Sequence, residues 1–353
     1  MTVRFCTLFD QRYATRGIVM LESLEQFRKP GDEVFVLALD AESRRTVQRI
    51  GGGRWRVLSI DDLQDSDLSD LKSTRPHKEF CWTCAPALSF YVTQISADDD
   101  IAIYVDSDLE FFDDPRVLLR ELGDAGTILI HEHRYSPDRM AWLETAGRFN
   151  VGFVAFRVGS EAKACVACWR TQTIESCESD SSKGLLGDQG YLNEWPGLYP
   201  NLRIIKNIGG GVAPWNVDQY QLGNVANKPT VDNVPVVFYH YHSLRTVFLW
   251  PFGLIAILPA VGYQFSADTL ALFYRPYLAG LRCSTAVVIR AGLAVEGDHG
   301  QSGRELLNQF AKGQILLSAG IPETAVKFLR RVVSIIFKLV SGLRHRFRAT
   351  TAQ

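Results

Sequence analysis

The chain has 353 residues, of which 46% are hydrophobic and 22% are charged. These values are near the globular average and exclude a disordered, collagen-like or coiled-coil protein. The formal net charge is −1, so the composition gives no reason to expect a nucleic-acid partner. Seven cysteines are too few for a disulfide-stapled secreted scaffold, and we expect a reducing compartment.

Short apolar runs alternate with helical patterns from residue 3 to about residue 240, which is typical of a mostly parallel sheet flanked by helices. The expected strands are 4–8, 33–39, 56–59, 101–106, 127–131, 151–157, 202–206 and 234–239. The expected helices are 17–27, 41–49, 83–95, 116–122, 160–177 and 189–195, several of them preceded by an Asp or Ser that can cap them. We therefore predict an α/β domain over residues 1–245.

After residue 245 the sequence becomes aromatic and interrupted by prolines, with a helical pattern over 268–281. We predict a helical appendage over residues 246–322. The longest apolar run, 247–263, contains two prolines and two glycines and is shorter than the roughly 20 residues that a helix needs to span a bilayer. We expect this run to be packed or to lie at an interface.

The last segment, residues 323–353, carries seven Lys/Arg and one Glu, a net charge of +6. Within 323–348 the basic residues follow one stripe and the apolar residues another, which predicts a basic amphipathic helix suited to an anionic membrane surface. The alternative is a helix that packs on its own domain. Because the N-terminus lacks the zones of a signal peptide, we expect a cytoplasmic protein, peripheral at the inner face of the cell membrane.

Two carboxylates, Asp106 and Asp108, follow a buried-looking strand at its C-terminal end, where open α/β sheets bind their ligands. In an extended chain both point to one side, with only the small Ser107 between them. Both can then bind one divalent cation, Mn²⁺ or Mg²⁺, that also holds a diphosphate. The alternative is a pair that caps turns at a strand end. We interpret the pair as a metal site.

Two histidines, His240 and His242, end the last expected strand of the domain. Two residues apart in an extended chain, they can face the same way, and a neutral imidazole is a suitable third ligand for Mn²⁺. The other histidine could contact phosphate. A structural role in the strand is the alternative.

Five short motifs occur in a characteristic order over residues 3–243. They are Thr7-Leu8-Phe9-Asp10, Asp106-Ser107-Asp108, Phe149-Asn150-Val151-Gly152-Phe153, Gly187-Asp188-Gln189-Gly190-Tyr191-Leu192-Asn193 and His240-Tyr241-His242-Ser243. In this order the chain resembles nucleotide-sugar glycosyltransferases of the GT-A (Rossmann-like) fold. It is most similar to glycosyltransferase family 8-like enzymes, bacterial nucleotide-diphospho-sugar transferases of surface-polysaccharide loci.

The resemblance implies a role for each matched residue. Metal binding would fall to Asp106, Asp108 and His240, and the catalytic sugar pocket to Asn150, Asp188 and Gln189. Contacts to the nucleotide-sugar would come from Thr7, Phe9, Asp10, Tyr13, Lys78, Asp106, Ser107, Asp108 and His242. The residues alone leave structural alternatives open. Asn150 could be a turn residue and Asp188 a helix cap. Lys78, like Arg75 and His77, could be a solvated loop residue.

The chain departs from the family after His240, where Tyr241 and His242 replace the usual Gly and Lys. Without that lysine, Arg245 or His242 would have to contact the donor phosphate. This departure leaves retention or inversion at the anomeric carbon open. The loop 209–216, with three glycines followed by Trp215 and Asn216, fits an acceptor pocket or a plain turn.

Two C-x-x-C pairs, Cys81/Cys84 and Cys165/Cys168, could indicate a zinc or redox site. Both lie in helical stretches, where cysteines three residues apart pack as small hydrophobic side chains. A phosphatase that uses D-x-D is a further alternative, but such enzymes place the motif on an early strand.

Together these patterns predict a metal-dependent, retaining glycosyltransferase. It would move a sugar from a nucleotide diphosphate, a UDP-sugar, to a hydroxyl of a saccharide or glycolipid acceptor in cell-surface polysaccharide or glycolipid synthesis. The alternative is a non-catalytic, membrane-associated protein that binds sugar nucleotides.

Overall fold

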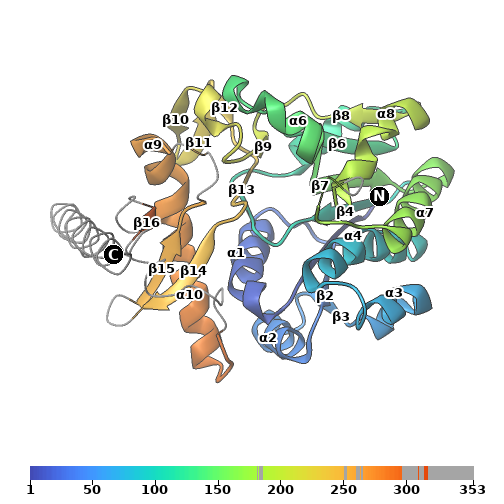
Figure 1. Cartoon of the computed structure of the whole chain (residues 1–353), viewed down its shortest axis with the longest axis horizontal. Helices are drawn as coiled ribbons and strands as arrows, with labels where there is room; N and C mark the ends of the chain where they lie inside the picture. Colours follow the sequence, from blue (N-terminus) through green and yellow to red (C-terminus); the bar gives the residue numbers. More distant parts are fainter. Residues whose placement is uncertain are drawn as a thin grey trace, which may run out of the picture.

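The centre of the molecule is a seven-stranded sheet with the strand order β3-β2-β1-β4-β7-β6-β8 (Figure 1). The structure is a computed structural model that describes residues 1–180, 182, 186–249, 253–259, 263, 265–295, 309 and 314–316. The strands of the central sheet are β1 (Val3–Phe9), β2 (Glu33–Ala38), β3 (Arg56–Leu58), β4 (Ile101–Val105), β6 (Ile128–Glu132), β7 (Phe149–Arg157) and β8 (Leu202–Ile204). Within this sheet β7 runs antiparallel to both neighbours and the other pairings are parallel, which confirms the predicted mostly parallel sheet.

Helices cover both faces of the sheet, and strand β4 shows why. All five of its residues are buried, as expected for an apolar strand in the middle of an α/β sheet. Ala102 and Tyr104 pack in a core formed with α4 and α7, whereas Ile101, Ile103 and Val105 pack in a core formed with α1 and α2. The helices are α1 (Ala14–Glu25), α2 (Ala41–Gly51), α3 (Ser66–Leu71), α4 (His77–Gln94), α5 (Arg116–Leu119), α6 (Leu143–Ala146), α7 (Ser160–Glu175) and α8 (Trp195–Leu198). Short 3-10 helices are η1 (Gln11–Tyr13), η2 (Asp61–Leu63), η3 (Arg120–Leu122), η4 (Pro137–Trp142), η6 (Gln189–Asn193) and η7 (Val217–Gln219).

Two predicted helices differ from the observed ones at prolines. Helix α4 begins at His77 instead of residue 83, because Pro76 adopts an extended conformation just before it and the helix continues through Pro86. The helix expected over 189–195 is the 3-10 helix η6, followed by α8. Pro196 lacks a backbone N–H and stands in the first turn of α8, so a single continuous helix through it is disfavoured.

The strand predicted over 234–239 is two strands in two different sheets. Strand β12 (Val234–Pro235) pairs with β11 (Lys228–Val231), which also pairs with β10 (Leu222–Val225). Strand β13 (Phe238–His240) lies between β5 (Leu109–Phe111) and β9 (Gly210–Val212). The chain crosses between the sheets at Val236 and Val237, whose amides donate to the carbonyls of Pro229 and Gly209. This crossing places His240 opposite Leu109, directly after Asp108.

The segment after residue 245 contains strands as well as helices, and these strands were not part of the predicted helical appendage over 246–322. There β14 (Arg245–Leu249) and β15 (Gly253–Ile257) form an antiparallel hairpin, extended by β16 (Ile315–Leu316), as suits sequences rich in β-branched residues. Helical structure follows in α9 (Ala267–Thr269), the π-helix η8 (Leu270–Tyr274) and α10 (Arg275–Arg290). Helix α10 packs against α1, and there Gly280 approaches Val19. The division at residue 245 stays a prediction.

No described helix is both long and apolar enough to cross a bilayer. The predicted basic helix over 323–348 lies outside the described residues.

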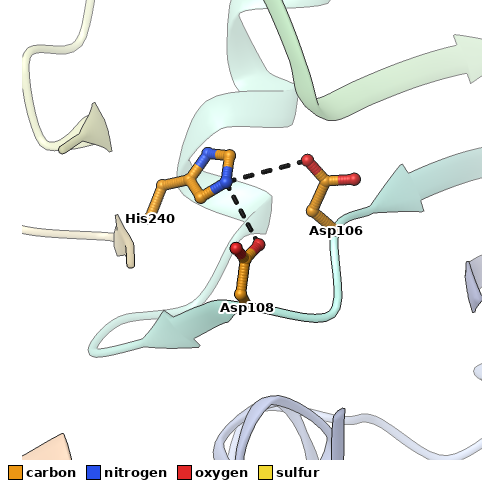
Figure 2. A group of neighbouring side chains, drawn as sticks. All are labelled: Asp106, Asp108 and His240. Atoms are coloured by element: carbon orange, nitrogen blue, oxygen red, sulfur yellow. Dashed lines mark ion pairs between the residues drawn. The ribbon is translucent and has the colours of Figure 1, made fainter. Parts of the chain in front are cut away.

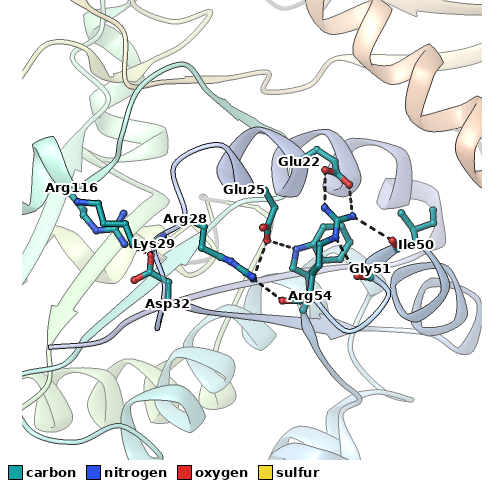
Figure 3. A network of polar contacts seen from close by, with 10 residues as sticks. Glu22, Glu25, Arg28, Lys29, Asp32, Ile50, Gly51, Arg54 and Arg116 are labelled. Atoms are coloured by element: carbon teal, nitrogen blue, oxygen red, sulfur yellow. Dashed lines mark hydrogen bonds and ion pairs between the residues drawn. The ribbon is translucent and has the colours of Figure 1, made fainter.

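Charged residues join α1 to the loop between α2 and β3 (Figure 3). Both guanidinium Nη atoms of Arg54 donate to the Glu22 carboxylate, at 3.0 and 2.6 Å. Glu25 accepts from the Trp55 indole at 2.8 Å and pairs with Arg28 at 3.1 Å. Each carboxylate of this network therefore has its own basic partner.

The cysteines of the two C-x-x-C pairs lie on α4 and α7, two helices that pack together. Cys84 and Cys165 are buried in the core on that side of the sheet, Cys81 is half-buried against the same core, and Cys168 is exposed. Burial raises the pKa of Cys81 to about 12. These positions fit the interpretation of these residues as packing side chains.

Candidate active site

Three potential metal ligands come together where β4 ends and β13 ends. Asp106 and Asp108 lie on the turn between β4 and β5, so a turn, and not the strand alternation that we expected, brings both carboxylates to one place. His240 Nε2 lies 3.1 Å from Asp108 Oδ1 and 3.8 Å from Asp106 Oδ2 (Figure 2). One ligand atom from each of the three residues lies within 4.8 Å of the others.

The donor set fits a divalent cation. Two carboxylate oxygens and one imidazole nitrogen are ligands that Mn²⁺ and Mg²⁺ accept. The Tyr104 hydroxyl donates a hydrogen bond to Asp106 Oδ1 at 3.0 Å, which fixes the orientation of that carboxylate. The other oxygen, Oδ2, faces His240. His240 is 4% exposed, so its ring is held in place by the surrounding protein.

Electrostatics make this arrangement costly without a cation. Burial raises the pKa of Asp106 to about 6 against the opposing charge of His240, and the nearby Asp108 adds to the rise. Burial would also raise the pKa of Asp108, but the charge and hydrogen bond of His240 lower it on balance. Burial and the charge of Asp106 raise the pKa of a third carboxyl group, Asp188, well above its ordinary value. Two carboxyl groups thus face the His240 imidazole, and Asp188 adds a third carboxyl group near Asp106.

A glycine makes room for the histidine ring. A Cβ atom on Gly152 would lie 2.9 Å from His240 Nδ1 and 2.7 Å from Asn150 Oδ1, closer than real contacts allow. The Gly152 amide donates to Asn150 Oδ1 at 2.9 Å, and its carbonyl accepts from the Asp106 amide at 3.1 Å. The motif 149–153 therefore shapes the metal site through its backbone.

A cavity of about 490 Å³ is lined in part by Asp106, one of the three potential ligands, and its volume is typical of small-molecule sites. Its wall includes six of the predicted site residues and a series of aromatic rings. The lining residues are Lys78, Trp82, Tyr104, Asp106, His133, Tyr135, Trp142, Thr145, Ala146, Asn150, Val151, Ser179, Leu186, Gly187, Asp188, Gln189, Trp215, His242, Ser243 and Tyr263.

The residues predicted for the sugar pocket lie together in this wall. Asn150 Nδ2 approaches Gln189 Oε1 at 3.4 Å and His133 Nε2 at 3.3 Å. Gln189 in turn donates to the Ala146 carbonyl at 2.9 Å. Asp188 is 6% exposed and close enough to Asp106 for the two charges to interact. Amide and carboxyl groups are therefore concentrated beside the metal ligands.

The residues predicted to contact the nucleotide base and ribose occupy different positions. Thr7 and Phe9 are buried at 1% and 2% exposure, and Phe9 belongs to the hydrophobic core. Asp10 accepts from the Tyr13 amide at 3.1 Å and lies 2.9 Å from His77 Nε2. These residues are not among the described residues that line the cavity, and their nucleotide role stays a prediction.

Among the basic residues considered for the diphosphate, Lys78 lines the cavity, with its ammonium 4.5 Å from the centre of the Trp82 ring. Arg75 instead donates to the carbonyls of Thr173 and Ile174 at the end of α7. Arg245 is in β14, outside the described cavity lining, whereas His242 lines it. Of the basic residues considered for the diphosphate, Lys78 and His242 thus face this space.

Several lining residues were missed at the sequence level. The strand-end rule that singled out Asp106 would also have found His133, since it follows a predicted strand. Tyr104 could not be told from a core residue of its strand. Trp142 and Tyr263 belong to segments without a regular pattern, and they meet the site through tertiary packing alone. Trp215, suggested by the loop 209–216, does line the cavity.

No protein-family profile matches the chain. Among curated proteins it is similar to two uncharacterized proteins of Bacillus subtilis (strain 168). YfnD is 29% identical over 284 residues, which cover 80% of this chain and 89% of YfnD. YfnF is 27% identical over 253 residues, which cover 70% of this chain and 83% of YfnF.

Among solved structures the chain is similar to the galactosyltransferase LgtC, determined in complex with donor and acceptor sugar analogues. The TM-score is 0.50 at 17% sequence identity, covering 80% of this chain and 96% of LgtC. The predicted GT-A fold is confirmed by this likeness.

Proposed function

We propose that this chain is a metal-dependent glycosyltransferase that moves a sugar from a nucleotide diphosphate, a UDP-sugar, to an acceptor hydroxyl. The observation that carries the proposal is the cluster of Asp106, Asp108 and His240, whose member Asp106 lines a cavity together with Asn150, Asp188 and Gln189. The fold shared with a galactosyltransferase supports it.

Different residues of the site have different roles in the proposed reaction. When bound by Asp106, Asp108 and His240, a divalent cation supplies positive charge that offsets the charge of the leaving diphosphate. Lys78 lines the same cavity and offers a second positive charge. The amide groups around Gln189 can donate to and accept from sugar hydroxyls, and Asp188 can stabilise positive charge at the anomeric carbon.

The bond changes favour retention. The bond from the anomeric carbon to the diphosphate oxygen breaks, and a bond to the acceptor oxygen forms. In a retaining reaction the departing phosphate oxygen takes the acceptor proton, so the enzyme needs no base. An inverting reaction needs a carboxylate base. The carboxyl groups in the described lining are Asp106, which is assigned to the metal, and Asp188, which is assigned to the sugar, so neither is left to act as the base.

For the cellular role, we propose cell-surface polysaccharide or glycolipid synthesis at the inner face of the membrane. The support is the basic amphipathic pattern of residues 323–348. Sedimentation of the full chain with vesicles tests it: binding to phosphatidylglycerol vesicles but not to phosphatidylcholine vesicles is expected, and equal partition would contradict it.

A panel of UDP- and GDP-sugars, incubated with and without Mn²⁺ and scored for released nucleotide, tests the activity. We expect release from a UDP-sugar only with the metal, and its loss in Asp108→Ala. Asp98→Ala, which removes an exposed carboxylate paired with Lys163, is the matched control and should leave release unchanged. Nucleotide binding without any release would favour the non-catalytic binding protein instead.

A further inference from the structure

A chain of ring contacts runs from the metal site along one side of the cavity. The Trp215 ring centre lies 5.2 Å from that of His240, and the rings that follow are His133, Tyr135, Trp142 and Tyr263. Successive centres in this series are 5.0, 4.7, 6.0 and 5.5 Å apart. We call Trp215, His133, Tyr135, Trp142 and Tyr263 the aromatic wall. It links a metal ligand to the segment after residue 245.

The aromatic wall is held by hydrogen bonds behind it. Arg134 donates to the carbonyls of Asn207 and Ile208, at 3.2 and 3.3 Å. Asn216 donates to the carbonyls of His133 and Gly211, at 2.7 and 2.9 Å. These bonds fasten the loop that carries Trp215 to the strand end that carries His133. A surface fixed in this way loses little conformational entropy when a ligand binds.

The chemistry of the aromatic wall is neutral, flat and partly polar. Burial lowers the pKa of His133 to about 3, so the wall carries no charge there at neutral pH. Trp215 Nε1 is a buried nitrogen with no hydrogen-bond partner among the described residues, and His133 Nε2 lies 3.3 Å from Asn150 Nδ2. Leaving a buried N–H unpaired costs free energy, which a ligand or water with suitable oxygens would recover.

A sugar ring matches both properties of this surface. One face of a pyranose presents C–H groups that can pack on aromatic rings, and its edge presents hydroxyl groups that can accept from and donate to polar atoms. An aliphatic chain would cover the rings but leave Trp215 Nε1 unpaired. The polar side chains of Thr145 and Gln189 beside the wall favour the sugar for the same reason.

We propose that the aromatic wall is the acceptor subsite and that the acceptor is a saccharide, whose pyranose ring stacks on Trp142 and Tyr263. The inference rests on the proposed function, because the wall begins at the metal site where the donor would react. Since Tyr263 belongs to the segment after residue 245, that segment takes part in acceptor binding as well as in packing.

The test uses the full-length protein with Mn²⁺ and measures binding by saturation-transfer NMR. The probes are the methyl α- and β-pyranosides of glucose and galactose, n-octyl phosphate, and a short peptide with Ser and Thr. We expect the pyranosides to bind, and Trp142→Ala and Tyr263→Ala each to weaken that binding by about tenfold, with partial rescue by Trp142→Phe.

Leu143→Ala is the matched control, since Leu143 is the next residue along, exposed, and outside the described lining. It should change neither pyranoside binding nor nucleotide release. Trp142→Ala should lower the affinity for pyranosides far more than the rate of nucleotide release, because the residues at the donor end of the cavity are unchanged in this variant.

Two results would overturn the acceptor inference while leaving the proposed function intact. One is binding of octyl phosphate or the peptide in place of the pyranosides. The other is equal pyranoside binding by Trp142→Ala, Tyr263→Ala and Leu143→Ala. Failure of the wild-type protein to release nucleotide from any sugar donor would instead overturn the proposed function.

Discussion

Two groups of charged residues in this molecule are built in opposite ways. In the network beside α1, Glu22 pairs with Arg54 and Glu25 with Arg28, near the surface (Figure 3). At the metal site Asp106 and Asp108 face His240, Asp188 lies close enough to Asp106 for their charges to interact, and the pKa values of Asp106 and Asp188 are raised. Each carboxylate of the first group has a basic partner, whereas in the second group two carboxyl groups face one imidazole, an imbalance that a bound cation would offset.

The largest effect is expected at the unbalanced group. Asp108→Ala removes one of two carboxylate ligands, and we expect metal-dependent nucleotide release to fall by about a thousandfold, because a bound cation contributes several kcal/mol to charge stabilisation. Mn²⁺ should raise the melting temperature of the wild-type protein but not of the variant. A variant that still releases nucleotide would remove the basis of the metal site.

A second test acts through the space around the histidine. In Gly152→Ala the new Cβ meets His240 Nδ1 and Asn150 Oδ1, so we expect Mn²⁺ affinity to fall by about 10- to 100-fold in calorimetric titration. Gly159→Ala is the matched control, since Gly159 has an extended backbone and nothing within 4 Å of the added Cβ. Equal affinity in the two variants would show that the ring does not need this space.

The pH dependence of stability should differ in sign between a satisfied and an unsatisfied carboxyl group. Asp100 accepts from the Thr2 amide and from Arg4, and these bonds outweigh burial and lower its pKa. The stability that Asp100 contributes to the folded state is therefore present above its unfolded pKa of about 3.9 and is lost as the pH falls below that value. Asp188 has a raised pKa, so the folded state holds its proton longer, and stability is lost as the pH rises above about 3.9.

At pH 7 we expect Asp100→Asn to lower the free energy of unfolding by about 1–3 kcal/mol. In the metal-free protein we expect Asp188→Asn to raise it by about 1 kcal/mol. Both differences from wild type should shrink towards pH 3. Urea unfolding at pH 3, 5 and 7 measures them. A loss of stability at pH 7 in Asp188→Asn would mean that its carboxylate is satisfied after all.

The smallest effect is expected in the balanced network. Glu22 and Arg54 are 47% and 37% exposed, so solvent and salt screen their attraction. In urea unfolding, Glu22→Ala should lower the free energy of unfolding by about 0.5 kcal/mol, and by less in 1 M NaCl. Nucleotide release should not change. A cost of several kcal/mol would show that this network is as critical to the molecule as the metal site.

The sequence predicted the parts of this molecule that depend on local pattern. The apolar run 101–105 indicated the central strand, and the carboxylates after it indicated the metal ligands, although a turn and not strand alternation orients them. The paired placement of Asn150 and Gln189 near them was expected from the resemblance and is found in the cavity wall.

The remainder depends on long-range packing. The break at Val236–Val237 is set by carbonyl groups of other segments and leaves no local signal, whereas the hairpin after residue 245 has β-branched residues that the helical prediction did not weigh. Phe9 had the polar, strand-end context of a ligand contact, but the close approach of Gly17 encloses its ring in the core. Trp142 and Tyr263 meet only in the folded chain.

The pairing of β13 with β5 has a consequence for how the protein is made. During synthesis the ribosome delivers Asp106 and Asp108 well before His240, and the three can meet only once β13 has docked beside β5. A nascent chain that lacks β13 therefore has no complete set of ligands, and capture of the ion coincides with closure of this distant contact. A bound metal ion would then distinguish chains in which β13 has docked from chains in which it has not.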